Sequence, residues 1–379
     1  MEKPEIYLDN AATTRVCTEA ADIAYKVMTD CYGNPSSTHA KGRDAKAYLD
    51  TARAQIASAL GCSASEVYFT SCGSESDVWA ITRGAESAAR RGRHIISSAV
   101  EHDAVRKTLE ELESRGFEVT YLSPEKDGSV SVDAVKAALR EDTILVTLMM
   151  VNNETGGITD IAAIAKMLKG CGSKALLHTD AVQGFMKVPF SAKKLGADMI
   201  SISGHKIHAP KGIGALYIKT GVKIKPLIRG GAQEGGMRAG TEAMPQIAAF
   251  GKAAEIAFSA MKDNCDTMAS LRALAMSTIC ADIPEAQIIG GGAPHILSVS
   301  LPGWRSEVLM NFLEAEGIYV SRSSACKKGG RSHVLEAMRL PAQVIDGAIR
   351  VSFSRYNTED DVLALCSALK RAHDTLAHR

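Results

Sequence analysis

The chain has 379 residues, of which 46% are hydrophobic and 23% are charged, and its 44 basic and 43 acidic residues give a formal net charge of +1. This composition is typical of an ordinary globular protein, and the length favours two domains. The charge balance gives no electrostatic signal for nucleic acid or an anionic membrane, no apolar stretch approaches the ~20 residues of a membrane helix, and the N-terminus lacks a signal-peptide pattern. We therefore expect a cytoplasmic protein that acts on small molecules and binds neither nucleic acid nor membrane directly.

Residues 60–220 alternate short apolar runs with amphipathic segments, as a succession of β-α-β units does. The predicted strands are residues 67–70, 94–100, 117–122, 144–151, 175–179, 199–203 and 213–219. The predicted helices between them are residues 75–91, 102–115, 133–140 and 161–170. The pattern indicates an α/β fold in which helices cover a mostly parallel, seven-stranded sheet.

The pattern changes after a long predicted helix at residues 243–277. The strands that follow are predicted at residues 295–301, 318–321 and 349–354, and the helices at residues 306–316, 333–339 and 358–376. This mixture is typical of a smaller α+β domain. We expect a large domain over residues 15–255 and a small domain that combines residues 1–14 with residues 256–379.

The nine cysteines are scattered through the chain without a CxxC pair. An odd number without paired spacing fits neither a disulfide framework nor a zinc site, so the sequence predicts no firm metal site. At least one of these thiols is a candidate for reactivity.

Polar residues stand directly after successive strands of the predicted large sheet. They are Ser74, His102, Asn153, Asp180, Gln183, Ser203, His205 and Lys206. Because ligands bind beyond the carboxyl ends of the strands in a doubly wound sheet, one cleft would collect all of these side chains. Each alone has a plain structural explanation, since a lone lysine is usually solvated and Asp180 could cap a helix. Their joint occurrence at five strand ends favours a ligand site.

This set of residues suits an aldehyde cofactor that carries a phosphate and a pyridine ring. Gly73 and Ser74 begin a helix whose free N–H groups suit a phosphate dianion. The side chains of Ser203 and His205 are further donors. Asp180 can keep the pyridine nitrogen protonated, which makes the ring an electron sink.

The remaining residues of the set suit the ring and its aldehyde. Asn153 and Gln183 can hydrogen-bond the phenolic oxygen of such a ring, and His102 can lie over its face. Lys206 supplies the amine that condenses with the aldehyde.

Ten ordered motifs sharpen this interpretation. They are YLDNAATT (7–14), GNPSSTHAKG (33–42), FTSCGSESD (69–77), EHDAV (101–105), NNETG (152–156), HTDAVQ (178–183), SGHKIHAPKG (203–212), GMRAGTEAMP (236–245), SSAC (323–326) and GAIRVSFSRYNTEDD (347–361). Together they resemble the cysteine desulfurases of the IscS/NifS type, which are class V aminotransferases and fold-type I pyridoxal 5′-phosphate enzymes. The resemblance runs from about residue 6 to residue 361.

The resemblance implies pyridoxal 5′-phosphate as cofactor, L-cysteine as substrate and L-alanine as product. It assigns the clamp for the substrate carboxylate to Arg350, whose planar guanidinium suits that group, with Asn153 as a further contact to the substrate. It makes Lys206 the base for the Cα proton and His102 a proton donor or acceptor. It also implies that Thr241 reaches the cofactor phosphate of the neighbouring subunit, so that the active enzyme is a homodimer.

Cys326 is, by the same resemblance, the nucleophile that takes the sulfur as a persulfide. The persulfide would pass to a protein acceptor such as an iron–sulfur scaffold, with Cys326 as a candidate transient cluster ligand. Four cations flank this cysteine in SRSSACKKGGR, namely Arg322, Lys327, Lys328 and Arg331. Nearby cations favour the thiolate form. Where the family usually has SSGSAC this chain has SRSSAC, and we expect Arg322 to pair with a nearby carboxylate.

Other functions stay open on the sequence alone. A related fold-type I enzyme, such as a selenocysteine lyase or a small amino-acid aminotransferase, would make Cys326 incidental. A non-catalytic scaffold for a sulfur acceptor is a third alternative, but the presence of Lys206, Asp180 and Gln183 argues against it.

Overall fold

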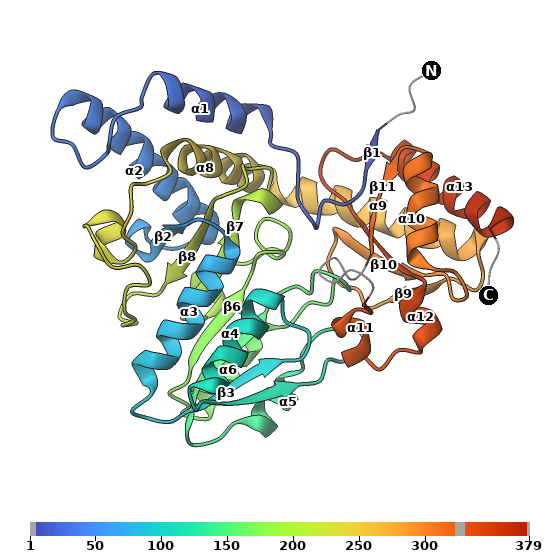
Figure 1. Cartoon of the computed structure of the whole chain (residues 1–379), viewed down its shortest axis with the longest axis horizontal. Coiled ribbons are helices and arrows are strands. Elements are labelled where there is room, and N and C mark those ends of the chain that lie inside the picture. Colours follow the sequence, from blue (N-terminus) through green and yellow to red (C-terminus); the bar gives the residue numbers. More distant parts are fainter. Residues whose placement is uncertain (1–4, 323–329, 377–379) are drawn as a thin grey trace.

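The computed structural model describes residues 5–322 and 330–376, which form a large sheet, a small sheet and the helices around them (Figure 1). The large sheet contains β2 (Val67–Thr70), β3 (His94–Ser98), β4 (Glu118–Leu122), β5 (Thr143–Met149), β6 (Leu176–Asp180), β7 (Met199–Ser203) and β8 (Gly214–Ile218). The strand order is β2-β8-β7-β6-β5-β3-β4, and β8 runs opposite to the other six strands. The predicted mostly parallel sheet of seven strands is confirmed, with strand ends within two residues of the prediction.

Helices cover both faces of the large sheet. The connecting helices are α3 (Gly73–Ala88), α4 (Asp103–Ser114), α5 (Val132–Ala138), α6 (Ile161–Gly170) and α7 (Ala192–Leu195). Alternate residues of a strand face opposite sides, and in β8 Ala215 and Tyr217 join one apolar core while Leu216 and Ile218 join the other. Burial on both faces explains why these strands are continuous apolar runs in the sequence.

The predicted single helix at residues 243–277 is wrong, because the segment forms two helices. These are α8 (Met244–Ser259) and α9 (Met261–Asp282), and the chain leaves helical geometry between them at Ala260, where φ is −110° and ψ is 20°. Helix α8 packs against the large-sheet core with α1 (Thr18–Thr29) and α2 (Ala40–Leu60), two helices that the sequence analysis did not predict. Helix α9 belongs to the core of the small sheet, so the break lets each half follow its own core.

The small sheet is antiparallel, in the order β12-β13-β10-β9. Its strands are β9 (Gln287–Ile289), β10 (Ile296–Ser300), β12 (Ser321–Arg322) and β13 (Ala348–Ser352). The helices on this side are α9, α10 (Ser306–Ala315), α11 (His333–Ala337), α12 (Ala342–Asp346) and α13 (Glu359–Thr375). The α+β character is confirmed, although β9 and α12 were not predicted, and the predicted strand at 318–321 divides into β11 (Ile318–Tyr319) and β12.

Residues 8–14 form a bridging segment between the two sheets. Before it, β1 (Ile6–Tyr7) pairs with β11 on the small-sheet side, and after it the chain reaches α1 on the large-sheet side (Figure 1). The Ala11 N–H donates to Ser352 Oγ at 2.8 Å, and the Thr14 N–H donates to the His205 carbonyl at 2.9 Å. The segment is therefore hydrogen-bonded to both the small-sheet side and the large-sheet side. The predicted division into domains at residues 14 and 255 stays a prediction.

No helix of the described ranges is long and apolar enough to cross a membrane.

A buried ion pair fixes the loop that joins β8 to α8. Glu234 is buried and adopts the left-handed conformation, with φ 48°. Its two carboxylate oxygens accept hydrogen bonds of 2.7 Å from the two terminal nitrogens of Arg53, and one of them also accepts from the Phe69 N–H at 2.9 Å. The ion pair and the N–H bond attach the loop to α2 and β2.

We expect Glu234→Gln to lower the free energy of unfolding by about 2–4 kcal/mol, because the mutation leaves the mostly buried Arg53 guanidinium without its counter-charge. Urea denaturation of the apo-protein measures this change. Glu255→Gln is the matched control, since it breaks an exposed pair with Lys252 and should cost less than about 0.5 kcal/mol. Equal effects of the two substitutions would contradict a structural role for the buried pair.

Candidate active site

A cavity of about 420 Å³ lies beyond the carboxyl ends of the large-sheet strands, where Arg350 of the small sheet also reaches it. Ten of the residues predicted from the sequence line it: Gly73, Ser74, His102, Asn153, Asp180, Gln183, Ser203, His205, Lys206 and Arg350. Thr241 is exposed and, within the described part of the chain, lies outside the cavity lining. Cys326 lies outside the described residues.

One end of the cavity is suited to an anion. Helix α3 begins there at Gly73, and its first N–H groups have no partner inside the helix. A Cβ at Gly73 would lie 2.7 Å from Val182 Cγ2, so a larger residue would crowd this turn. Ser203 Oγ is buried and has no hydrogen-bond partner among the described residues, which leaves it available to a ligand. His205 lies beside this end, where burial lowers its pKa to about 4 and keeps the ring neutral at pH 7.

Asp180 ends β6 and is buried. Its Oδ1 accepts the Val182 N–H at 2.8 Å, which fixes the orientation of the carboxyl group. Burial raises the pKa of Asp180, while the charges of His102 and Lys206 oppose that rise. A cationic partner, such as a protonated ring nitrogen, would therefore stabilise the carboxylate form.

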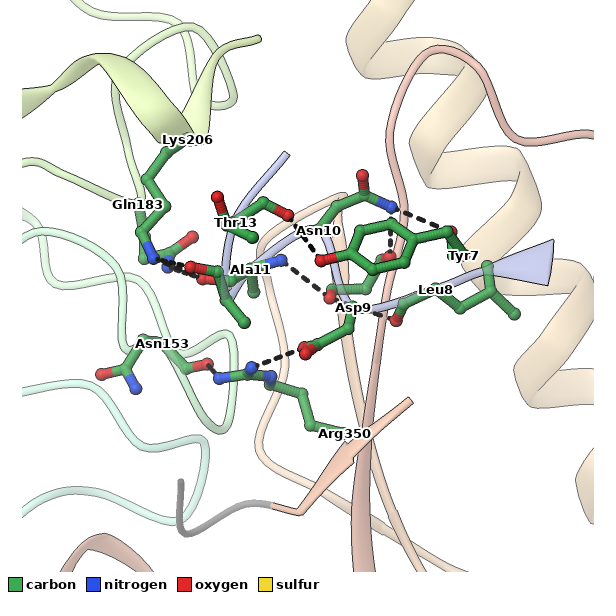
Figure 2. A network of polar contacts seen from close by, with 12 residues as sticks. Tyr7, Leu8, Asp9, Asn10, Ala11, Thr13, Asn153, Gln183, Lys206 and Arg350 are labelled. Carbon is green, nitrogen blue, oxygen red and sulfur yellow. Dashed lines mark hydrogen bonds and ion pairs between the residues drawn. The ribbon is translucent and has the colours of Figure 1, made fainter. Parts of the chain in front are cut away.

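Lys206 belongs to a short turn of 3₁₀ helix (Gly204–Lys206) directly after β7. Its Nζ donates to the carbonyls of Ala11 and Ala12 in the bridging segment, at 2.8 and 2.7 Å (Figure 2). Burial, and then the nearby Arg350 charge, lower the pKa of Lys206 from 10.5 to about 7. A large fraction of this amine is consequently neutral and nucleophilic near pH 7.

His102 is the N-cap of α4, and its Nδ1 accepts the Ala104 N–H at 3.1 Å. An acceptor at Nδ1 places the proton of the neutral ring on Nε2. The cap thus fixes the tautomer and leaves Nε2 as the nitrogen that can exchange a proton with a ligand.

Arg350 reaches the cavity from β13, although its side chain is only 3% exposed. It donates to the Asn153 carbonyl at 2.8 Å and forms an ion pair of 2.9 Å with Asp9 Oδ1 (Figure 2). Its Nε is buried and has no partner within the described ranges. Asp9 lies in the motif at residues 7–14, but its role could not be predicted from the sequence, because a carboxylate 341 positions away carries no local signal.

Two buried glutamates, Glu101 and Glu154, also escaped the sequence analysis. Glu154 Oε2 accepts the Ser332 hydroxyl at 2.5 Å, and the Glu101 carbonyl is 3.1 Å from His333 Nε2. Burial raises the pKa of Glu154 to about 7 and that of Glu101 to about 8. Through these contacts, the start of α11 is attached to the wall of the cavity. Their only sequence signal is their place in the motifs after β3 and β5.

Two of the four cations around Cys326 are described. Arg322 forms an ion pair with Glu307, as predicted, and Arg331 forms one with Asp346 at 2.7 Å. Both guanidinium groups are therefore partly neutralised by carboxylates.

The lining of the cavity fits pyridoxal 5′-phosphate. The helix N-terminus and the unpaired Ser203 hydroxyl suit its phosphate, the Asp180 carboxylate suits its ring nitrogen, and the buried amine of Lys206 suits its aldehyde.

Comparison with known proteins agrees with this fit. A family model described as Aminotransferase class-V matches residues 6–365. Cysteine desulfurase IscS of Methanosarcina thermophila is 43% identical over 366 residues, which cover 95% of this chain and 90% of the relative. A cysteine desulfurase of Trichormus azollae is 44% identical over 362 residues, covering 94% and 90%. The solved structure of a NifS-like protein, 38% identical, superposes with a TM-score of 0.93 over 98% of this chain and 100% of that one.

The fold and the cavity define a fold-type I enzyme that depends on pyridoxal 5′-phosphate. The chain belongs to the aminotransferase class-V family and, within it, to the cysteine desulfurases of the IscS/NifS type. The predicted family, fold class and cofactor are confirmed.

The lowered pKa of Lys206 predicts how cofactor capture depends on pH. Only the neutral amine attacks an aldehyde, so the capture rate should fall about tenfold per pH unit below pH 7 and level off above it. Stopped-flow absorbance of the apo-protein mixed with pyridoxal 5′-phosphate measures this rate, with N-acetyl-lysine as the reference for titration of the cofactor itself. A rate that keeps rising toward pH 10.5 would contradict the lowered pKa.

Proposed function

We propose that this cysteine desulfurase removes the sulfur of L-cysteine, releases L-alanine and leaves the sulfur as a persulfide on Cys326 for transfer to a protein acceptor. The observation that carries the proposal is the convergence of the Lys206 amine, the Asp180 carboxylate and the Arg350 guanidinium on one cavity. An iron–sulfur scaffold is the acceptor class that we expect, and the cytoplasm is the expected location.

The residues of the cavity would hold pyridoxal 5′-phosphate in one orientation. Gly73, Ser74 and Ser203, which line the cavity with His205, would receive the phosphate. Asp180 would pair with the ring nitrogen, and His102 would contact the ring. When bound, the cofactor supplies an electron sink that stabilises negative charge at the substrate carbon.

Arg350 is the group that would hold the substrate carboxylate. Its guanidinium is fixed by Asp9 and by the Asn153 carbonyl, so its direction is set before substrate binds. The unpaired Nε leaves a donor available to the carboxylate. The ion pair with Asp9 also limits the unpaired charge that the site must bury.

Lys206 and His102 would carry the protons. The neutral fraction of Lys206 makes its amine a competent base for the proton on Cα. His102 presents Nε2 for a second proton, since its Nδ1 is engaged in the helix cap.

Cys326 would act after these steps. Its thiolate forms a bond to the substrate sulfur while the carbon–sulfur bond of the substrate breaks. The electron pair of the broken bond stays with the carbon skeleton, which is protonated and leaves as L-alanine. Cysteine and one thiol are thereby converted into alanine and one persulfide, with no external oxidant or reductant.

The proposed homodimer has structural support near Thr241. Arg238, three residues earlier, forms hydrogen bonds of 2.9 and 3.2 Å with the carboxylate of Glu75 in the first turn of α3. This ion pair holds the loop beside the phosphate end of the cavity and leaves Thr241 exposed, as a residue that serves the partner subunit would be.

Selenocysteine lyase or aminotransferase activity is the alternative, because neither reaction needs the Cys326 persulfide. Incubation with L-cysteine distinguishes these activities, since only a desulfurase yields equal amounts of alanine and protein-bound sulfur.

Cys326→Ser should retain the visible absorbance of the bound cofactor but form no persulfide, because the residue acts only after cofactor and substrate are in place. Mass spectrometry of the intact protein after incubation with L-cysteine detects one added sulfur atom in the wild type. Cys72→Ser is the matched control, since the Cys72 thiol lines the cavity, and it should leave persulfide formation intact. Normal sulfur uptake by the Cys326 variant would reject the proposed role.

A further inference from the structure

A buried histidine links the small sheet to the cavity. His295 directly precedes β10, and its ring is fully buried. Its carbonyl accepts the Phe353 N–H at 2.9 Å, which fixes the backbone next to β13. Its Nε2 is 3.2 Å from Oε1 of Gln183, a residue that follows β6 of the large sheet and lines the cavity.

The hydrogen-bond partners determine which ring nitrogen of His295 carries the proton. The Ala11 carbonyl can only accept, and it lies 2.8 Å from Gln183 Nε2, so the amide nitrogen faces Ala11. The amide oxygen then faces His295 and can only accept, so His295 must donate from Nε2. The neutral ring has no hydrogen on Nδ1, and Nδ1 is indeed buried without a partner in the part of the chain that the structure describes.

The surroundings keep this ring neutral. Burial lowers the pKa of His295 well below its ordinary value, and the positive charges of Lys187, Arg350 and Lys206 lower it further. A second proton would also place a buried N–H where the described residues offer no acceptor. The ring is therefore a fixed donor across the pH range in which the protein is folded and active.

The hydrogen bond from His295 leaves the Gln183 amide nitrogen facing the cavity. An amide nitrogen carries two hydrogens, and the Gln183 nitrogen uses one of them for Ala11. The other is available at the cavity wall, where the sequence predicts a contact with the phenolic oxygen of the cofactor. Lys206 donates to the same Ala11 carbonyl at 2.8 Å, so any rotation of the Gln183 amide would disturb the site of the amine as well (Figure 2).

We propose that His295 is a positioning residue, whose Nε2–H fixes the Gln183 amide with its nitrogen toward Ala11 and the cavity, and so sets the hydrogen bond to the phenolic oxygen of the cofactor. Without this donor, the buried Gln183 oxygen has no partner, and the bond to the Ala11 carbonyl alone must hold the amide, so its orientation is less firmly fixed. The inference rests on the cofactor site of the proposed function but not on sulfur transfer.

The test compares His295→Gln with His295→Asn, neither of which can carry a charge. The glutamine amide reaches as far as imidazole Nε2 and can donate to Gln183, whereas asparagine is one methylene shorter. A donor to the phenolic oxygen stabilises the anionic form of that oxygen. It thereby lowers the pKa of the nitrogen that joins Lys206 to the cofactor. We expect the asparagine variant to raise the pH midpoint of the cofactor's visible absorbance by roughly half a unit to one unit, and to weaken the binding of pyridoxal 5′-phosphate about tenfold. The glutamine variant should remain close to the wild type.

His94→Asn is the control for a merely structural effect. His94 is another fully buried histidine, bonded to Thr143 and Thr120 at 2.8 Å, at the opposite end of β3 from the cavity. Its substitution should lower the melting temperature without moving the absorbance midpoint.

Absorbance titration and apo-protein reconstitution need no turnover, so failure of sulfur transfer would leave this test unaffected. Equal midpoints for the two His295 variants would overturn the inference. So would a shift of the same size in the His94 variant. The double variant tests whether His295 acts through Gln183. If His295→Asn does not shift the absorbance midpoint further once Gln183→Leu is present, action through Gln183 is supported. Additive shifts from the two substitutions would overturn it.

Discussion

The site depends on the bridging segment, because residues 8–14 supply the polar partners of the two basic side chains that the cavity brings together. Arg350 is buried, Lys206 is partly buried, and the positive charge of Arg350 lowers the pKa of Lys206. Two carbonyls of the segment accept from Lys206, and the carboxylate of Asp9 pairs with Arg350. A buried cation without such partners would be costly, so an ordered segment is a condition for having both groups in one cavity.

Burial also gives the cavity its chemical character. The same loss of water raises the pKa of Asp180 and lowers the pKa of Lys206, so the acid and the amine are both shifted toward their neutral forms. Bound pyridoxal 5′-phosphate would lower the pKa of Asp180 again, because its ring nitrogen would offer this carboxylate a cationic partner. Its aldehyde would need the neutral amine that the lowered pKa of Lys206 provides. The electrostatics of the cavity thus complement the cofactor that the family binds.

The large sheet and most of the site could be predicted because their signals are local. A strand that is buried on both faces is an apolar run, and the polar residue at its carboxyl end follows at once, as Asp180 and Lys206 do. The link between Gln183 and His295 could not be predicted, because its partners are 112 positions apart and lie next to strands of different sheets. The break at Ala260 escaped prediction because both halves of the segment are helical and only their packing differs. The pairing of β1 with β11 involves two residues from each strand, which is too short for a periodic pattern.

The central claim is that Lys206 is the amine that binds the cofactor, and a second buried lysine makes this claim open to direct test. Burial lowers the pKa of Lys187 to about 8, so this residue also has a partly neutral amine in the protein core. Borohydride reduction of the holoenzyme makes the cofactor linkage permanent, and peptide mass spectrometry then locates it. The account predicts that the added mass of the reduced cofactor lies on Lys206 alone. Its presence on Lys187 or on any other lysine instead would contradict the account.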